Sequence, residues 1–281
     1  MQPIGIFDSG YGGLTVMREI VRELPQYDYV YLGDNARTPY GTRSFETVYQ
    51  YTLECVQKLF ALGCPLVVLA CNTASAKALR NIQQLDLPRL FPASPDAPTD
   101  GPTRRVLGVI RPTTEVLGNY SKTGHVGILA TRGTVLSESY VVELEKFFPH
   151  LNVFQEPCPM WVPLIENGEH ARHGADYFVQ QHLNRLLGQS PEIDTILLAC
   201  THYPLLLPKI RQYTPEHVTI LSQGEIVARS LSDYLTRHPA LARQCTQTGQ
   251  RQFLTTDSAD DFSRQASPFW GETVSAVHLS L

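Results

Sequence analysis

Two short stretches of the chain, VLACNTAS at residues 68–75 and LLACTHYP at residues 197–204, indicate the fold. Each consists of an apolar run, then Ala-Cys, then small polar residues of the kind that begin helices. A short apolar run that leads directly into a helix is typical of a buried strand in a parallel α/β sheet. The same local pattern therefore occurs twice, each time with a cysteine at the same point.

The sequence around these stretches continues the alternation of strands and helices. Apolar runs predict strands within residues 3–8, 27–34, 64–71, 105–110, 125–131, 151–157, 194–200, 217–221, 251–256 and 276–281. Helical spacing is clearest at residues 14–24, 44–63, 72–85 and 222–238, and Gly63 is the expected end of the second of these helices. The Pro-rich segment at 91–103 interrupts the rhythm and predicts a loop or linker. We expect two α/β domains.

Composition and charge narrow the class of protein. Hydrophobic residues make up 43% of the 281 residues and the formal net charge is −4. Basic residues do not cluster, so nucleic acid and acidic membrane surfaces are not expected partners. The N-terminal residues lack the pattern of a signal peptide, and no apolar run reaches the roughly 20 residues of a membrane span. We therefore expect a cytoplasmic protein, in which the six cysteines do not form a disulfide framework.

The repeated cysteines, Cys71 and Cys200, are candidates for acid–base chemistry. Ligands of parallel α/β folds bind at the carboxyl ends of the strands, where both residues are expected. A helix that begins there carries partial positive charge, which favours a thiolate and suits a substrate carboxylate. The other cysteines are interpreted as ordinary buried residues; they are Cys55, Cys64, Cys158 and Cys245.

Further polar residues follow the ends of strands. Asp8 and Ser9 close the first strand, His202 lies two residues beyond Cys200, and Glu166 lies in an acidic loop. Two thiols with a carboxylate near one and a histidine near the other form a two-sided acid–base site. Such a site suits the inversion of a stereocentre, because one side removes a proton while the other side delivers one. A hydrolase with a single cysteine nucleophile would not need the second copy.

Other readings of these residues remain open. Gly10, Gly12 and Asp34 allow a dinucleotide-binding turn, although Thr15 stands where that motif requires glycine. Asp34 can equally be structural and bind the turn after its strand. Cys71, Cys200 and His202 allow a zinc site, although a fourth ligand and the usual spacing are missing. A dinucleotide site leaves the pair of cysteines unexplained.

The chain also resembles the glutamate racemases of the aspartate/glutamate racemase family. The resemblance extends almost from end to end, with CNTAS and CTHYP together as its most specific part. It rests on these segments in the family's order: IGIFDSGYGGLTVMREI, YLGDNARTPYGTRS, VVLACNTASA, GVIRPT, VGILATRGTVLSESY, PLIENGE, LLACTHYPLL and FLTTDSADDFSRQASPFWG. Asn35 and Arg111 depart from the family pattern, where threonine and glutamate are usual.

The resemblance implies two flavodoxin-like parallel-sheet domains related by a pseudo-two-fold axis, with the active site in the cleft between them. It places residues 1–103 and 215–281 in the first domain and residues 104–214 in the second. It implies interconversion of L- and D-glutamate for peptidoglycan synthesis by a cytoplasmic homodimer, without pyridoxal phosphate, nucleotide or metal. Carried over to this sequence, the catalytic residues are Cys71, Cys200, Asp8, His202 and Glu166, and the substrate-binding residues are Asp8, Ser9, Tyr40, Gly41, Asn72, Thr73, Thr201 and His202.

Two rival functions follow from the same residues. An aspartate racemase would use the same pair of thiols and would act on aspartate in preference to glutamate. A two-domain amino-acid-binding protein would bind a ligand without exchanging its α-proton. Assays of exchange and of substrate preference separate all three functions.

Overall fold

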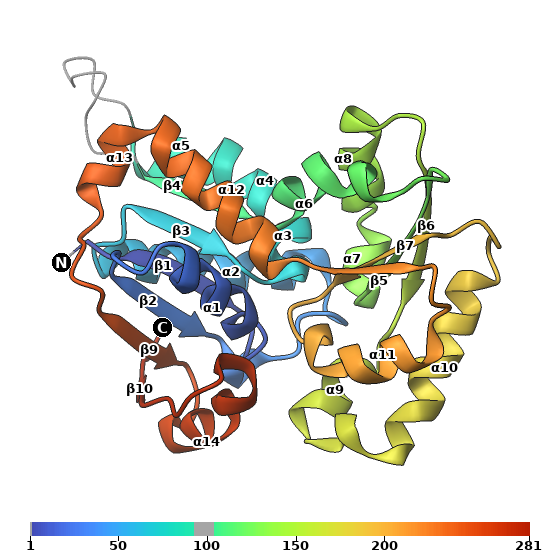
Figure 1. Cartoon of the computed structure of the whole chain (residues 1–281). Coiled ribbons are helices and arrows are strands. Elements are labelled where there is room, and N and C mark those ends of the chain that lie inside the picture. The colour runs from blue at the N-terminus through green and yellow to red at the C-terminus, as the bar shows by residue number, and fades with distance from the viewer. Residues whose placement is uncertain (1, 93–103) are drawn as a thin grey trace.

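The computed structural model describes residues 2–92 and 104–281, and these residues form two α/β domains side by side (Figure 1). Each domain contains one sheet in which all paired strands run parallel. The expected fold class, two parallel-sheet α/β domains, is confirmed. The Pro-rich segment predicted at 91–103 lies outside the described residues except for its first two positions.

Every predicted strand is present in the described residues. The strands are β1 Ile4–Asp8, β2 Tyr29–Gly33, β3 Leu66–Leu69, β4 Arg105–Gly108, β5 His125–Ala130, β6 Asn152–Pro157, β7 Thr195–Ala199, β8 Thr219–Ser222, β9 Arg251–Thr255 and β10 Ala276–His278. The helices are α1 Leu14–Glu23, α2 Phe45–Ala61, α3 Asn72–Lys77, α4 Leu79–Asn81, α5 Leu87–Leu90, α6 Ile110–Leu117, α7 Arg132–Leu136, α8 Ser139–Phe147, α9 Trp161–Glu166, α10 His173–Leu187, α11 Leu207–Tyr213, α12 Gly224–Arg237, α13 Pro239–Gln244 and α14 Ala259–Trp270. Gly63 follows α2 with a φ of 93°, the left-handed conformation expected of a glycine that ends a helix.

The two sheets share one strand order. The first sheet is ordered β10-β9-β2-β1-β3-β4 and the second β6-β5-β7-β8. When the strands are counted within each domain, both sheets contain the order second, first, third, fourth, as in flavodoxin-like folds. β3 and β7 are therefore equivalent strands, and the two repeated cysteines follow equivalent strand ends.

Helices cover both faces of each sheet, as buried parallel strands require. Side chains of β1 alternate in direction: Ile4 and Ile6 pack with residues of α1, α12 and α14, whereas Phe7 packs with residues of α2. In the second domain Ile128 packs with α6 and α8, and Leu129 belongs to the core that includes α9, α10 and α11.

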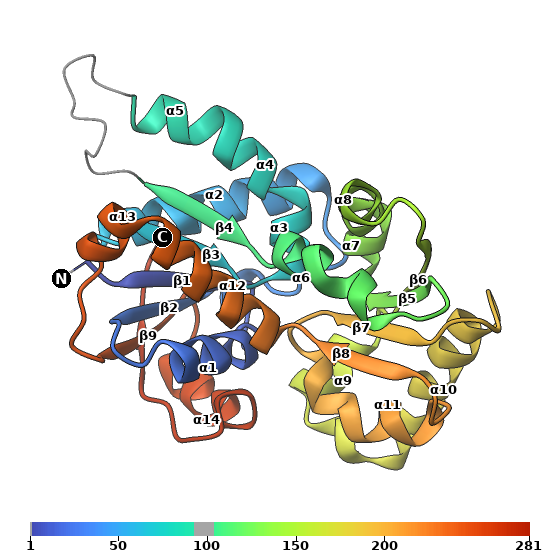
Figure 2. The same cartoon turned by 45° about the horizontal axis from the view of Figure 1, so that its top comes forward.

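The chain crosses between the domains immediately after the fourth strand of each. β4 pairs with β3 in the first sheet and leads into α6 beside the second sheet, whereas β8 pairs with β7 in the second sheet and leads into α12 beside α1 (Figure 2). This pairing differs from the predicted boundaries, which put 105–108 in the second domain and 219–222 in the first. Apolar periodicity identifies such strands but does not specify their sheet. β9 and β10 return to the first sheet, as the resemblance implied.

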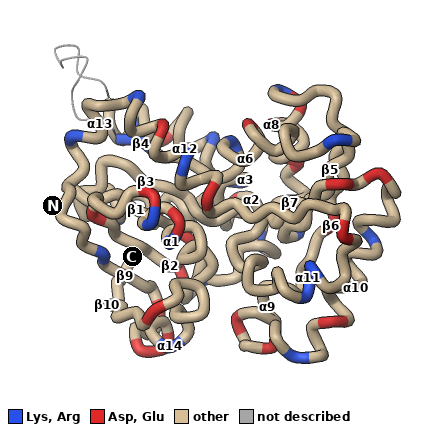
Figure 3. Tube along the Cα trace, viewed as in Figure 1, with Lys and Arg blue, Asp and Glu red and all other residues tan. Residues whose placement is uncertain are grey.

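Acidic and basic residues are interspersed over both domains, in line with the small net charge (Figure 3). None of the helices in the described residues is both long enough and apolar enough to span a membrane.

Candidate active site

A cavity of about 80 Å³ lies where the carboxyl ends of the two sheets meet. A buried water needs roughly 10–15 Å³ of such space, so the cavity holds about five to eight waters and fits a small polar molecule, not a dinucleotide. Both domains contribute to its lining, which consists of Ser9, Thr38, Pro39, Tyr40, Gly41, Thr42, Cys71, Asn72, Thr73, Thr131, Arg132, Cys158, Pro159, Val162, Pro163, Cys200, Thr201 and His202. Every predicted site residue except Asp8 and Glu166 lines this cavity.

Cys71 caps α3 with its own side chain. Its sulfur accepts a hydrogen bond from the backbone N–H of Ala74 at 3.4 Å and lies 3.6 Å from the Ser9 hydroxyl. The expectation that the helix terminus would yield a thiolate here is not met. Burial, with a contribution from the charge of Asp8, raises the pKa of Cys71 to about 12, because these effects outweigh the hydrogen bonds. Cys71 is therefore a protonated thiol at neutral pH.

Asp8 lies behind the cavity and connects the domains. One carboxylate oxygen accepts from the backbone N–H of Gly10 at 3.0 Å, and the other accepts from the Thr201 hydroxyl at 3.4 Å. Its side chain is almost wholly buried, and this burial raises its pKa although the charge of His202 acts in the opposite direction. Asp8 thus connects the turn after β1 in the first domain with Thr201, the residue between Cys200 and His202 in the second domain.

Cys200, His202 and Glu166 form a chain of polar contacts. His202 Nδ1 lies 4.0 Å from the Cys200 sulfur, and His202 Nε2 lies 2.9 Å from a Glu166 oxygen. Burial alone would lower the pKa of His202, but the contacts with Cys200 and Glu166 outweigh it and raise the pKa to about 10. His202 is therefore an imidazolium at neutral pH, adjacent to one of the two thiols.

The turn after Cys200 is not the α-helix start expected from the sequence. Residues Tyr203–Leu206 form a 3-10 turn, and α11 begins only at Leu207. Pro204 lies within this turn, where proline is tolerated because the first N–H groups have no helical partner. The charge near Cys200 therefore comes from His202, not from an α-helix terminus.

The Gly-rich turn after β1 passes directly against the second domain. A Cβ atom at Gly12 would overlap both the His202 ring and the Thr201 hydroxyl. Thr15, at the start of α1, donates from its hydroxyl to the Thr201 carbonyl at 2.8 Å. The glycines interpreted as a possible phosphate-binding turn thus allow close contact between the domains.

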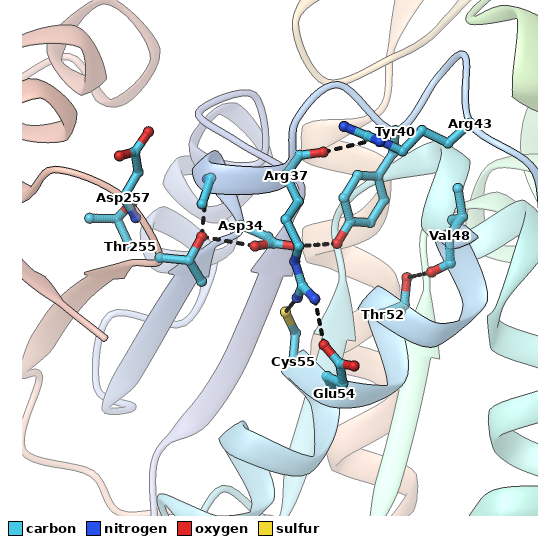
Figure 4. A network of polar contacts seen from close by, with 12 residues as sticks. Asp34, Arg37, Tyr40, Arg43, Val48, Thr52, Glu54, Cys55, Thr255 and Asp257 are labelled. Carbon is cyan, nitrogen blue, oxygen red and sulfur yellow. Dashed lines mark hydrogen bonds and ion pairs between the residues drawn. The ribbon is translucent and has the colours of Figure 1, made fainter. Parts of the chain in front are cut away.

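Asp34 supports the loop that carries Tyr40 and Gly41. Its carboxylate accepts from the Tyr40 hydroxyl and from Arg37 Nε at 2.7 Å (Figure 4). It also accepts from the Thr256 hydroxyl at 2.8 Å. All of these partners belong to the first domain, and Asp34 is fully buried. The structural interpretation of Asp34 thus explains the residue, whereas the ribose-binding interpretation does not.

Two further contacts join the domains at the cavity. The Gly41 carbonyl accepts from the backbone N–H of Gly133 at 2.8 Å. The hydroxyls of Thr73 and Thr131 lie 2.9 Å apart, so one donates to the other. Tyr40, Gly41 and Thr73 therefore lie where the domains meet, as their assignment to the site requires.

Sequence reasoning missed several lining residues, among them Thr131 and Cys158. Thr131 follows β5 and Cys158 follows β6, so the rule of strand carboxyl ends, applied to every strand, would have indicated both. Cys158 was interpreted as an ordinary buried cysteine; it is buried and also lines the cavity. Its burial raises the pKa of its thiol well above the ordinary value.

The C-terminal helix also reaches the site. The ring of Phe269 in α14 meets the His202 ring edge-to-face, with 5.4 Å between centroids, and it stacks on Tyr11. These residues come from opposite ends of the chain and were not indicated by the sequence. Phe269 and His202 are both buried at this contact.

Within residues 2–92 and 104–281, no three His, Cys, Asp or Glu side chains are arranged to hold a metal ion. Cys71, Cys200 and His202 therefore do not form the zinc site that the sequence left open.

Comparisons of this chain with a family model and with individual proteins indicate the same family. A model of the Asp/Glu/Hydantoin racemase family matches residues 4–231. A glutamate racemase of Persephonella marina is 37% identical over 279 residues, which cover 99% of this chain and 97% of that protein.

Solved structures show the same similarity over the whole length. A glutamate racemase isoform of Bacillus anthracis has a TM-score of 0.86 and 34% identity, with 100% of this chain and 98% of that chain covered. A glutamate racemase of Francisella tularensis in complex with D-glutamate has a TM-score of 0.83 and 26% identity, with 100% and 97% covered.

Proposed function

Since the chain belongs to the Asp/Glu/Hydantoin racemase family, we propose that it interconverts L- and D-glutamate with two thiols that act on opposite faces of the α-carbon. One observation carries the proposal: Cys71 and Cys200 follow equivalent strands of two domains and line one small cavity. The chain is a racemase, so a single group on one face does not suffice. Deprotonation and reprotonation must occur on opposite faces.

The two thiols begin in different states in this mechanism. Cys71 is protonated because its pKa is about 12, and the His202 imidazolium lies with its Nδ1 4.0 Å from the Cys200 sulfur. The Cys200 thiolate takes the α-proton, so the C–H bond breaks and an S–H bond forms. Cys71 then donates its proton to the opposite face of the carbanion and becomes the thiolate. The reverse reaction begins from this second state.

The remaining polar residues support the two proton transfers. Glu166 holds His202 by its Nε2, and Asp8 supports the Cys71 side through the Gly-rich turn. The substrate carboxylates would be bound by the hydroxyl, amide and backbone N–H groups of the lining. These residues are Ser9, Tyr40, Gly41, Asn72, Thr73, Thr201 and His202. Thiols perform both transfers, so the proposal requires no cofactor or metal.

The proposed biological setting follows from the resemblance. D-glutamate is a building block of peptidoglycan, so we infer that the enzyme supplies D-glutamate for cell-wall synthesis in the cytoplasm. From the resemblance we also infer that the enzyme is a homodimer. Gel filtration with light scattering would test the dimer: a mass near that of one 31.4 kDa chain would contradict it.

The first experiment uses purified protein with L-glutamate in D₂O and no added cofactor. Optical rotation and the α-proton NMR signal are followed together, with aspartate in parallel. Racemisation and exchange on glutamate are the expected result. Faster reaction on aspartate would transfer the two-thiol mechanism to an aspartate racemase. Saturable binding without exchange would instead support an amino-acid-binding protein.

A further inference from the structure

A ring of three buried hydrogen bonds joins the two domains behind the cavity. The Asn72 amide donates to Gln223 Oε1 at 2.7 Å, the Gln223 amide donates to the Tyr140 hydroxyl at 2.6 Å, and that hydroxyl donates to Asn72 Oδ1 at 2.6 Å. Each member of this polar ring, Asn72, Tyr140 and Gln223, both donates and accepts once. All three side chains are at most 4% exposed.

The polar ring lies where the chain crosses between the domains. Gln223 stands between β8 and α12, at the second crossing. Its amide also donates to the Thr113 hydroxyl of α6 at 2.9 Å, and Thr113 in turn donates to the carbonyl of Val109, the residue between β4 and α6. The single amide of Gln223 therefore connects both crossings.

The polar ring also connects to the thiols. Asn72 is the first residue of α3 and directly follows Cys71, while Tyr140 lies on α8 of the domain that carries Cys200. Because the ring is buried, a change in the angle between the domains must either preserve its three bonds or leave polar groups unpaired. The arrangement in which all three bonds form is the one described here.

We propose that Tyr140 and Gln223 are positioning residues, which hold the N-terminus of α3 so that Cys71 faces Cys200 across the cavity. This inference rests on the proposed two-thiol function. Neither residue lines the cavity, and each acts through Asn72. The polar ring thus fixes the relative position of two groups that must act on one carbon from opposite sides.

Kinetics with matched variants test this role. Tyr140→Phe removes one oxygen from the ring, and Gln223→Met removes the amide while keeping the length of the side chain. The control is Tyr29→Phe, which removes an equally buried hydroxyl whose 2.7 Å bond to the Leu24 carbonyl lies away from the site. Misplacement of about 1 Å costs up to ~10²-fold in rate, so we expect kcat to fall by about tenfold or more in both ring variants, equally in both directions. KM should change less, and the control should keep the wild-type kcat.

Alkylation provides a measurement that does not depend on racemisation. Cys71 and Cys200 are each only 6% exposed, so we expect iodoacetamide to react slowly with them while the polar ring holds the domains together. Each ring variant loses at least two buried hydrogen bonds, so the alkylation rate of both thiols should rise by about tenfold or more in these variants and not in Tyr29→Phe. Peptide mass spectrometry assigns the modified residues.

The outcomes separate this inference from the proposed function. If Tyr140→Phe matches Tyr29→Phe in kcat, thermal stability and alkylation, the polar ring is only structural and the inference is wrong. If the wild type does not exchange the α-proton of glutamate, the proposed function fails, while alkylation still reports whether the ring holds the domains. Should Gln223→Met not fold, Tyr140→Phe decides the question alone.

Discussion

At Cys71 the local backbone and the surrounding protein act in opposite directions on one thiol. The N–H of Ala74 and the Ser9 hydroxyl stabilise negative charge on the sulfur, but burial and the charge of Asp8 oppose it more strongly. A cysteine at a helix start is often a thiolate; here it is held as a thiol. In the proposed mechanism Cys71 is therefore the proton donor, and the cationic His202 lies beside the other thiol.

Removal of either thiol should abolish racemisation. Cys71→Ala and Cys200→Ala each eliminate one acid–base group, and such groups contribute about 10²–10⁴-fold to rate. We expect kcat to fall by at least ~10³-fold in both variants. The assay follows the change in the circular dichroism of glutamate as one enantiomer is converted into the other. Cys245→Ala, which removes a buried thiol away from the cavity, is the matched control. Near-normal turnover in either site variant would exclude the two-thiol mechanism.

His202 should make the stability of the protein depend on pH. Its pKa is raised from 6.5 to about 10 in the folded state, so the stabilisation is complete below pH 6.5 and is lost as the pH rises towards 10. Hydrogen bonds to a charged group contribute roughly 1.5–3 kcal/mol, and we expect a loss of about this size. Urea unfolding at pH 6, 8 and 10 measures it. His202→Asn should lack this component; an identical pH dependence in that variant would contradict the assignment.

At the scale of elements, the turns after the strands determine how closely the domains approach. Ten strands were recognised from apolar runs because a buried strand has a strong local signal. The turn after Cys200 was not recognised as a 3-10 turn, because its residues resemble the helix-starting residues after Cys71. Tyr203 at the start of this turn is fully buried in the core.

Gly12 provides a test at this scale. It lies so close to the side chains of Thr201 and His202 that Gly12→Ala must displace these two side chains or the turn after β1. We expect kcat/KM to fall by about 10²-fold, because a shift of about 1 Å separates the reacting groups. Gly174→Ala is the control, since a Cβ there meets no atom within 4 Å. Similar kinetics in the two variants would show that the close approach at Gly12 is not required.

At the scale of the whole molecule, the cavity belongs to neither domain alone. A ligand that binds there contacts residues of both domains. It therefore binds the folded protein and not the unfolded chain. Binding therefore adds to the stability of the whole chain, in proportion to the logarithm of the ligand concentration.

This linkage predicts a thermal shift. At about 100 times its Kd, D-glutamate should stabilise the protein by about 2.7 kcal/mol, which raises Tm by roughly 5 °C for a chain of this size. Differential scanning fluorimetry measures the shift, with D-aspartate as the matched ligand. An equal or larger shift with aspartate would favour the rival substrate.

The difference between local and tertiary information is clearest at the two crossings. Residues 105–108 and 219–222 have the apolar pattern of buried strands, and this pattern predicted both strands correctly. Their membership of a sheet depends on β3 and β7, which lie far away in the sequence. The predicted domain boundaries were therefore misplaced at these strands, although the two-domain fold was correct.

The sequence by itself determined the strands, the two parallel sheets, the repeated thiols and the family, because each is encoded by neighbouring residues or by motifs in order. Only the tertiary structure decided that burial protonates Cys71, that Glu166 and Phe269 contact His202 and that Gln223 connects both crossings. These properties depend on distance and on exclusion of water between segments remote in the chain. Neither quantity is encoded in the local order of residues.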